Sequence, residues 1–318
     1  MRRFKNILVV HEQGRENDAM MQRVSHLARS NGARIAVAGV VEAPPGELAR
    51  LYSALPGLRS YDAEFEVIEF CRKALEGVAQ EFERQGIETS TCVLQGTAFI
   101  EIIKYVMHAG HDLVIKSAAG KDVGYRRLLT SLDMHLMRKC PCPVWIVQPQ
   151  EQFQHKKIMA AVDPDPDDVQ RDAVSRTVMD LATSLSEIDE AELHVVHAWR
   201  LYGENTMRSS AFLRTSEEQL GLLLNEQERS SREKLNGLLS SYPIIYKRSQ
   251  VHMIKGNAAD VLTTFAREND IDVIVMGTLS RSGIQGLLIG NAAETVLNEA
   301  ACSVLAVKPP GFLSPVGK

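Results

Sequence analysis

The chain repeats itself, and this constrains its fold more than any other feature. Sliding the 318-residue sequence against itself by 160 positions aligns residues 96–149 with residues 256–309 without a gap. The identical pairs are Gly96 and Gly256, Ala98 and Ala258, Asp112 and Asp272, Leu128 and Leu288, Cys142 and Cys302, Val144 and Val304, Val147 and Val307, and Pro149 and Pro309. They fall mostly at turns, strand starts and one apolar strand, where backbone geometry and packing are most demanding. The repeat therefore predicts a tandem duplication, joined near Pro149 to His155.

Each half alternates short apolar runs with longer amphipathic stretches. The apolar runs predict strands at Lys5–Val10, Arg34–Val41, Thr89–Leu94, Asp112–Lys116, Val144–Val147, Lys156–Val162, Glu192–Ala198, Val251–Ile254, Asp272–Met276 and Val304–Val307. The amphipathic stretches predict helices at Asp18–Asn31, Glu64–Arg84, Phe99–Met107, Leu128–Lys139, Arg171–Ser184, within Thr215–Ser240, at Ala258–Glu268 and from Gly290-Asn291 onward. This alternation favours an α/β fold with right-handed crossovers. We expect two tandem, doubly wound, five-stranded parallel-sheet (Rossmann-like) domains, at residues 1–150 and 155–310.

The composition limits the class of protein. A net charge of −4 argues against a general nucleic-acid binder, which would carry a basic surplus. The apolar run after the basic start, Ile7 to Val10, is too short for a signal peptide, and no segment approaches a membrane span. Five cysteines in a chain without a secretion signal indicate reduced thiols. We therefore expect a cytoplasmic protein that binds neither membrane nor nucleic acid.

A ligand site is expected where the strands of the second half end, because open parallel sheets bind ligands beyond the carboxyl ends of their strands. The polar and small residues at those ends are Asp163, Ala198, Gly256, Met276 and Gly277, followed by the glycine-rich loop and Gly290-Asn291. A helix that begins at Gly290 presents N–H donors to an anion such as phosphate. The alternative is structural: any βα turn can require a glycine, and Asp163 can simply cap the next helix.

These residues resemble the nucleotide motif of the universal stress protein family, and the tandem layout resembles its two-domain E-type members. The family motif is Gly, two residues, Gly, nine residues, then Gly-Ser or Gly-Thr. Gly277 and Gly290 keep the outer spacing, while Ser280 and Asn291 replace the inner glycine and the last hydroxyl. The resemblance places Asp163 and Ala198 beside adenine.

The resemblance also implies a function. It implies a stress-resistance protein acting in DNA damage and starvation, with ATP or another adenine nucleotide, with or without Mg²⁺, in the second half. It pairs the last strands, Val144–Val147 and Val304–Val307, in an internal pseudo-dimer that can form a further homodimer. In the first half Glu12, Ser117 and Thr130 depart from the motif, so that half is expected to be degenerate.

Two other functions stay open: a slow nucleotide hydrolase, and a carrier of an apolar, lipid-like ligand in the same site. No P-loop, no catalytic triad and no paired-carboxylate arrangement can be identified from spacing, so no catalytic residue is assigned. Within the first half, Arg126 and Arg127 are able to hold an anion but are expected to be a solvated surface pair.

Several metal signals are set aside. Cys140-Pro141-Cys142 lacks a zinc or redox spacing. His194 and His197 lie three apart on one strand and should point to opposite faces. The acidic loop from Asp163 to Asp168 is expected to cap a helix, although Asp163 and Asp165 are the first carboxylates to consider for Mg²⁺. The leucines of residues 215–240 are expected to pack in the core, with a lipid or partner groove as the alternative.

Overall fold

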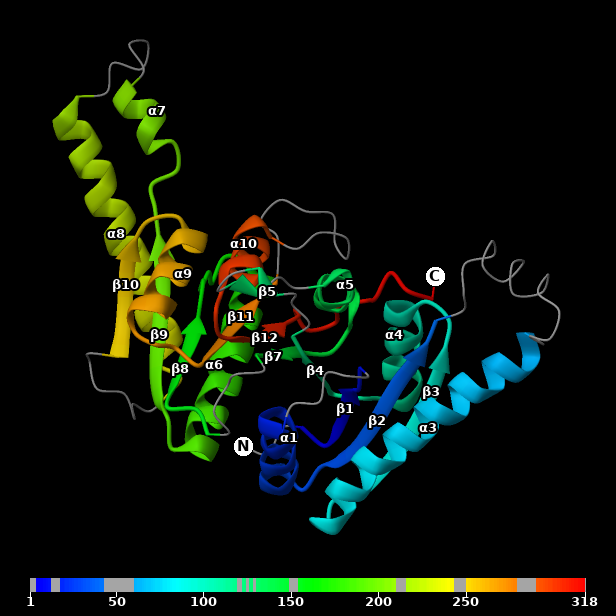
Figure 1. Ribbon diagram of the computed structural model, residues 1–318. Helices are drawn as coiled ribbons and strands as arrows, with labels where there is room; N and C mark the ends of the chain where they lie inside the picture. The colour runs from blue at the N-terminus through cyan, green and yellow to red at the C-terminus, as the bar shows by residue number, and fades with distance from the viewer. Residues whose placement is uncertain are drawn as a thin grey trace.

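The computed structural model describes residues 4–12, 18–42, 60–118, 122–123, 126–127, 130–148, 154–209, 216–242, 250–278 and 290–317. These residues form an α/β fold in which helices cover both faces of a ten-stranded sheet (Figure 1). Each half contributes strands that pair in parallel with one another. The predicted pair of doubly wound parallel sheets is confirmed.

The first half supplies the elements from β1 to β7. Its strands are β1 (Asn6–Val10), β2 (Arg34–Val41), β3 (Thr89–Gln95), β4 (Leu113–Ser117), β5 (Asp122–Val123), β6 (Arg126–Arg127) and β7 (Val144–Val147). Its helices are α1 (Asp18–Asn31), α3 (Ser60–Arg84), α4 (Ala98–Ala109) and α5 (Ser131–Lys139). The short strands β5 and β6 pair antiparallel outside the main sheet, and the sequence analysis did not predict them.

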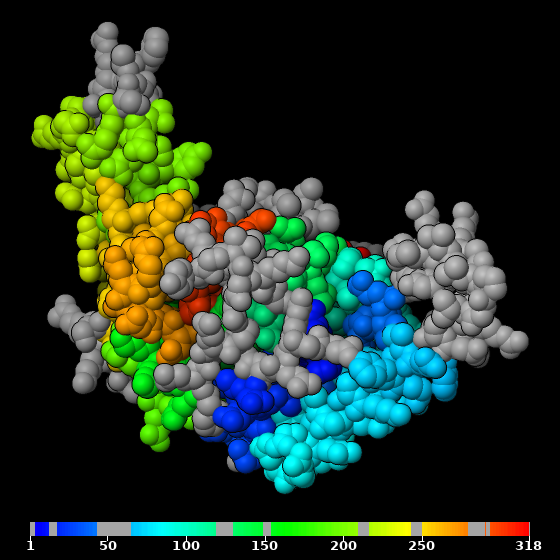
Figure 2. All heavy atoms as spheres, viewed as in Figure 1, coloured from blue at the N-terminus to red at the C-terminus, as the bar shows by residue number. Residues whose placement is uncertain are grey.

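The second half repeats this order. Its strands are β8 (Lys157–Ala161), β9 (Glu192–Trp199), β10 (Val251–Lys255), β11 (Val273–Gly277) and β12 (Ser303–Val307). Its helices are α6 (Val169–Asp189), α7 (Glu204–Ser209), α8 (Glu217–Leu239), α9 (Ala258–Glu268) and α10 (Asn291–Glu299). The short helix α7 was not predicted. In Figure 1 it stands beside the outer end of α8, beyond the edge of the sheet, and in Figure 2 this region projects from the rest of the molecule.

The strand order is β10-β9-β8-β11-β12-β7-β4-β1-β2-β3. The order along the chain reverses between β8 and β11 in the second half, and between β1 and β4 in the first. Such switch points leave a crevice at the carboxyl ends of the strands, because the flanking crossovers run to opposite faces. The topology thus offers one crevice in each half.

The two halves join through β7 and β12, which pair antiparallel with Trp145 opposite Leu305. The predicted pairing of the two last strands is confirmed. The buried side chain of Arg23 on α1 also forms an ion pair with the buried Asp189 on α6, and the Asp189 carboxylate accepts a hydrogen bond from His155 (2.8 Å). The predicted domain limits, 1–150 and 155–310, fall around residues 149–153, which lie outside the described part of the chain, and they stay predictions.

The core has two layers, one on each side of the sheet. Helices α1, α3, α6 and α8 cover one face and α4, α5, α9 and α10 the other. A strand covered on both faces must be apolar along its whole length, which explains why β1, β4, β7 and β12 are buried throughout. The edge strands β3 and β10 are only half-buried. Lys116 on β4 is the one charged residue within these four strands, and its side chain is fully buried.

Three predicted helix starts need correction. Helix α3 begins at Ser60 rather than Glu64. Helix α5 begins at Ser131 rather than Leu128, because Thr130 and Asp133 form a capping box at its start. Helix α6 begins at Val169, because the Asp168 side chain accepts hydrogen bonds from the N–H groups of residues 170 and 171. The structural alternative for Asp163, a helix cap, is therefore wrong for this helix.

Candidate functional site

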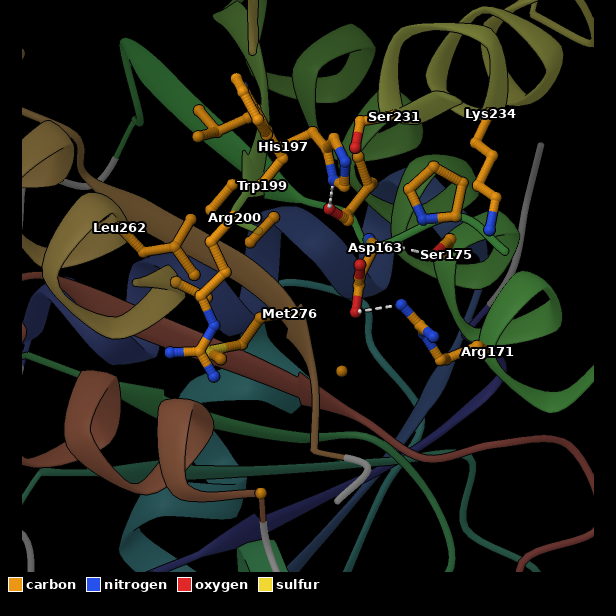
Figure 3. Close-up of a pocket in the computed structure, with 18 of the residues that line it drawn as sticks. Asp163, Arg171, Ser175, His197, Trp199, Arg200, Ser231, Lys234, Leu262 and Met276 are labelled. Carbon is orange, nitrogen blue, oxygen red and sulfur yellow. Dashed lines mark hydrogen bonds and ion pairs between the residues drawn. The ribbon is translucent and has the colours of Figure 1, made fainter. Parts of the chain in front are cut away.

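A cavity of about 820 Å³ opens at the carboxyl ends of the second-half strands (Figure 3). Of the predicted site residues, it is lined by Asp163, Ala198, Gly256, Met276, Gly277 and Gly290. Ser280 lies outside the described residues. Asn291 is the first residue of α10, and its side chain is not described. The structure thus brings together residues that are up to 127 positions apart in sequence.

One wall of the cavity carries a network of charges. Arg171 on α6 forms ion pairs with Asp163 (3.0 Å) and Asp165 (2.7 Å), and Lys234 on α8 forms one with Asp165 (2.6 Å). The hydrogen bond from Lys234 and the charge of Arg171 hold the pKa of Asp165 below its usual value. Because cations already occupy both carboxylates, this loop is poorly suited to Mg²⁺. Among the described residues, no three His, Cys, Asp or Glu side chains lie close enough together to hold a metal ion.

Helix α8 forms part of this wall, which the sequence analysis did not foresee. Its Gln227, Ser230, Ser231 and Lys234 line the cavity. Leu220 and Leu235 are buried as expected, whereas Leu223 is 44% exposed, so the core-packing prediction is wrong for that residue. Arg171 and Lys234 sit inside regular helical patterns, and only the placement of α6 and α8 on the sheet shows which helix face meets the cavity.

Both strand-end glycines have a packing role. A Cβ at position 277 would overlap Cγ1 of Val174 on α6. Gly256 has φ of +157°, and a Cβ there would lie 2.8 Å from Cγ2 of Val261. A packing reason for these glycines therefore exists whether or not a ligand binds.

Two helix N-termini border the cavity. Gly290 precedes α10 and Asn257 precedes α9, and neither makes a side-chain hydrogen bond that caps its helix. Both residues line the cavity. The first N–H groups of a helix lack partners within the helix and carry a partial positive charge. The cavity is thus polarised, with Asp163 on one side and helix N-termini on the other.

Matching backbone hydrogen bonds define which residues of the two halves correspond. Asp112 N–H donates to Asn6 O and Asp272 N–H to Lys157 O, both at 3.0 Å. These bonds make Glu12 the counterpart of Asp163. Counting along β4 and β11 in the same way, Lys116 corresponds to Met276 and Asp133 to Ala293.

In the first half, side chains fill the position of the cavity. The Lys116 ammonium lies 2.6 Å from a Glu12 carboxylate oxygen and 2.8 Å from one of Asp133. Lys116 and Asp133 are fully buried. In the second half the counterparts of Lys116 and Asp133 are Met276 and Ala293, which leave the space open. The structure therefore gives a physical reason for the degenerate first half that its motif predicts.

Of the two histidines on β9, only His197 lines the cavity. His194 faces His252 on β10, with 3.2 Å between their ring nitrogens, and burial lowers the pKa of both imidazoles. His197 lies on the opposite face, where Nδ1 is 3.0 Å from Val162 O. The predicted opposite orientation of His194 and His197 is confirmed. The five cysteines are free thiols, including Cys140 and Cys142.

No helix within the described ranges is long and apolar enough to cross a membrane.

Comparisons with known proteins agree on one family. The sequence model of the "Universal stress protein family" matches residues 3–148 and 154–308. The chain is 26% identical over 319 aligned residues to universal stress protein E of Escherichia coli, covering 99% of this chain and 98% of that one. It is 24% identical to a universal stress protein E homolog of Haemophilus influenzae, covering 96% and 98%.

Solved structures show the same fold. A protein from Pseudomonas aeruginosa UCBPP-PA14 superimposes with a TM-score of 0.73 at 23% identity, covering 98% of this chain and 95% of that chain. A universal stress protein from Archaeoglobus fulgidus gives 0.67 at 16% identity, covering 95% and 98%. With a family match that spans both halves, the chain belongs to the universal stress protein family and has its tandem, E-type architecture.

Proposed function

We propose that the second half binds an adenine nucleotide and that the first half does not. The observation that carries this proposal is the cavity lined by Asp163, Ala198, Gly256, Gly277 and Gly290. Its polarity supports the proposal. A carboxylate at one side accepts hydrogen bonds from an adenine amino group or ribose hydroxyls, and helix N-termini at the other side favour phosphate.

The chemistry favours binding over hydrolysis. Phosphoryl transfer to water needs a group that orients or deprotonates the water. Asp260 and Glu294 lie in the first turns of α9 and α10, but neither lines the cavity. Arg200 and Asn257 do line it, and neither is a general base. Asp163 and Asp165 are paired with Arg171. Mg²⁺ that arrives with the nucleotide is then coordinated by phosphate oxygens and water.

A matched pair of substitutions tests the site. Ala198 of the second half and Val40 of the first half occupy equivalent positions. Each precedes a residue, Trp199 or Val41, whose carbonyl accepts a hydrogen bond from the N–H of the equivalent glycine, Gly256 or Gly96. Ala198→Leu places a larger side chain in the cavity and is expected to weaken ATP, ADP and AMP binding by about 10-fold or more, as measured by calorimetry. Val40→Leu is the control and should leave affinity unchanged. Equal behaviour of the two variants would place the site elsewhere.

An apolar ligand is the second candidate, because Val174, Trp199, Leu262 and Met276 also line the cavity. Mass spectrometry of organic extracts from the purified protein identifies a bound lipid. A lipid recovered from the wild type but not from Ala198→Leu, together with no calorimetric response to nucleotides, would support the apolar carrier instead.

We further propose that the nucleotide-bound protein acts in the cytoplasm in resistance to DNA damage and starvation. A strain that lacks the protein should survive these stresses less well, and wild-type protein should restore survival. Ala198→Leu should fail to restore it while Val40→Leu succeeds. Full rescue by Ala198→Leu would separate the stress role from the cavity.

A further inference from the structure

Arg200 is the first residue after β9, and it lines the cavity. Its side chain is exposed, and within the described part of the chain it makes no hydrogen bond or ion pair. In Figure 3 it extends toward Met276 and away from Arg171 and Lys234. The cavity therefore has an unpaired guanidinium group on the side opposite its charge network.

The residues of β9 show on which face of the sheet the Arg200 guanidinium group lies. Val196 packs in the core layer under α9 and α10 together with Leu262. Side chains of a strand alternate between faces, so Ala198 follows Val196 on that same face. Arg200, just past the end of β9, extends toward Met276, which belongs to the same core layer (Figure 3). Arg200 thus leaves the sheet on the side of the two uncapped helix N-termini.

In the first half, the position equivalent to Arg200 is occupied by an acidic residue. Gly96 N–H donates to Val41 O (3.1 Å), and Gly256 N–H donates to Trp199 O (2.9 Å). The residues that follow the two acceptors, Glu42 and Arg200, are therefore counterparts. The charge at this position is inverted between the halves.

Glu42 places an anion at a helix start. Its carboxylate accepts a hydrogen bond from the N–H of Ala98, the first residue of α4, at 3.4 Å. The counterpart of Ala98 is Ala258, the first residue of α9, and the N-cap Asn257 makes no side-chain cap. The first half thus satisfies its helix start with its own carboxylate, whereas the second half presents a guanidinium group and a partially positive helix start to the same space.

Two positive groups that share a cavity wall repel each other unless an anion lies between them, and each of them binds an anion well. A guanidinium group also donates hydrogen bonds in a fork that matches phosphate oxygens. We propose that Arg200 and the first turn of α9 form a phosphate subsite that the ligand of the second half fills. This inference rests on the proposed nucleotide function and makes it specific: the site selects nucleotides over nucleosides.

The subsite also accounts for the substituted loop motif. Ser280 and Asn291 depart from the family pattern in the loop that leads to α10. A guanidinium group from β9 supplies phosphate contacts from a different strand end. Affinity for phosphate is then expected to depend on Arg200.

The experiment compares adenosine, AMP, ADP and ATP by calorimetry on the full chain and on Arg200→Ala, Arg200→Glu and Glu42→Gln. Loss of a charge-assisted contact is expected to weaken nucleotide binding by about 10-fold to 100-fold in Arg200→Ala. Adenosine affinity should change by less than about 2-fold, because adenosine has no phosphate. Glu42→Gln, the matched control in the first half, should leave all four affinities unchanged.

Arg200→Glu has a second, independent readout. It rebuilds the first-half arrangement, so its carboxylate should accept a hydrogen bond from Ala258 and raise the melting temperature while nucleotide binding is lost. A melting temperature below that of Arg200→Ala contradicts the proposed geometry. An equal loss of adenosine and ADP affinity in Arg200→Ala, or no loss at all, overturns the subsite.

The subsite and the proposed function can fail separately. If the wild type binds neither adenosine nor any nucleotide, the proposed function fails. Pyrophosphate then tests the subsite alone. Saturable pyrophosphate binding that Arg200→Ala abolishes upholds the phosphate subsite, and the absence of pyrophosphate binding to the wild type overturns it.

Discussion

Lys308 is a buried lysine at the junction of the two halves, and replacing it should change how stability depends on pH. Its ammonium donates hydrogen bonds to Thr278 Oγ1 (2.7 Å) and to the carbonyl of Met137 on α5. Burial lowers its pKa from 10.5 to about 7, and the nearby Cys140 offsets this only in part. Between these two values the unfolded chain binds more protons than the folded one, so stability rises as pH rises.

The magnitude follows from the shift. One pKa unit corresponds to about 1.4 kcal/mol, and the folded lysine is already half-deprotonated at pH 7. Between pH 7 and pH 9 Lys308 should therefore add about 2 kcal/mol to the free energy of unfolding. Lys308→Met removes the titrating group and should lack this rise.

The assay is denaturant unfolding at pH 7, 8 and 9, followed by circular dichroism, for wild type, Lys308→Met and Lys104→Met. Lys104 is a half-exposed lysine on α4, so its replacement controls for the loss of one surface charge. The stability difference between wild type and Lys308→Met should move by about 2 kcal/mol over this range in favour of the wild type. Parallel pH profiles for these two proteins would show that Lys308 keeps its proton when buried, and the reasoning would be wrong.

Three further substitutions test the packing and the buried charges. Asp189→Asn should destabilise the protein by about 3 kcal/mol at pH 7, because it leaves the buried Arg23 without its carboxylate. Thermal melting measures this loss. The stability difference between wild type and Asp189→Asn should shrink at acidic pH, where Asp189 itself becomes protonated. Gly277→Ala should cost about 1–3 kcal/mol in denaturant unfolding, and Val174→Ala should relieve the overlap in the double variant. Lys116→Met should cost about 3 kcal/mol, and adding Asp133→Ala should recover part of it; additive losses would show that the two side chains do not interact.

The sequence predicted the layers of the fold well because its signals were local or repeated. Apolar β-branched runs placed the main strands within a residue or two, and the resemblance to the universal stress protein family predicted the pairing of β7 with β12. Helix starts depended on single capping side chains such as Asp168 and Thr130, which compete with their neighbours for that role. The hairpin β5–β6 and helix α7 are too short to produce a periodic pattern.

The site was predicted in part, for a different physical reason. Strand ends converge at a switch point whatever the helices do, so Asp163, Ala198 and Gly277 could be placed together from topology. Arg171 and Lys234 could not, because the face that a helix turns toward the cavity depends on its rotation against the sheet. Lys116 did leave a signal: a lysine within a strand expected to be buried on both faces requires buried partners.

The asymmetry of the two halves follows from how each satisfies its charges. In the first half, removing Lys116 leaves the buried carboxylate of Asp133 without its cation, a loss of about 3–5 kcal/mol, so opening a cavity there by that substitution alone is costly. The second half has no comparable unpaired buried charge at its cavity, because the exposed Arg200 is in contact with water. The first half retains a structural role, because β7 pairs with the edge of β12, a strand buried along its whole length that would otherwise expose unpaired N–H and C=O groups. One copy therefore completes the sheet, and the other is free to hold a ligand.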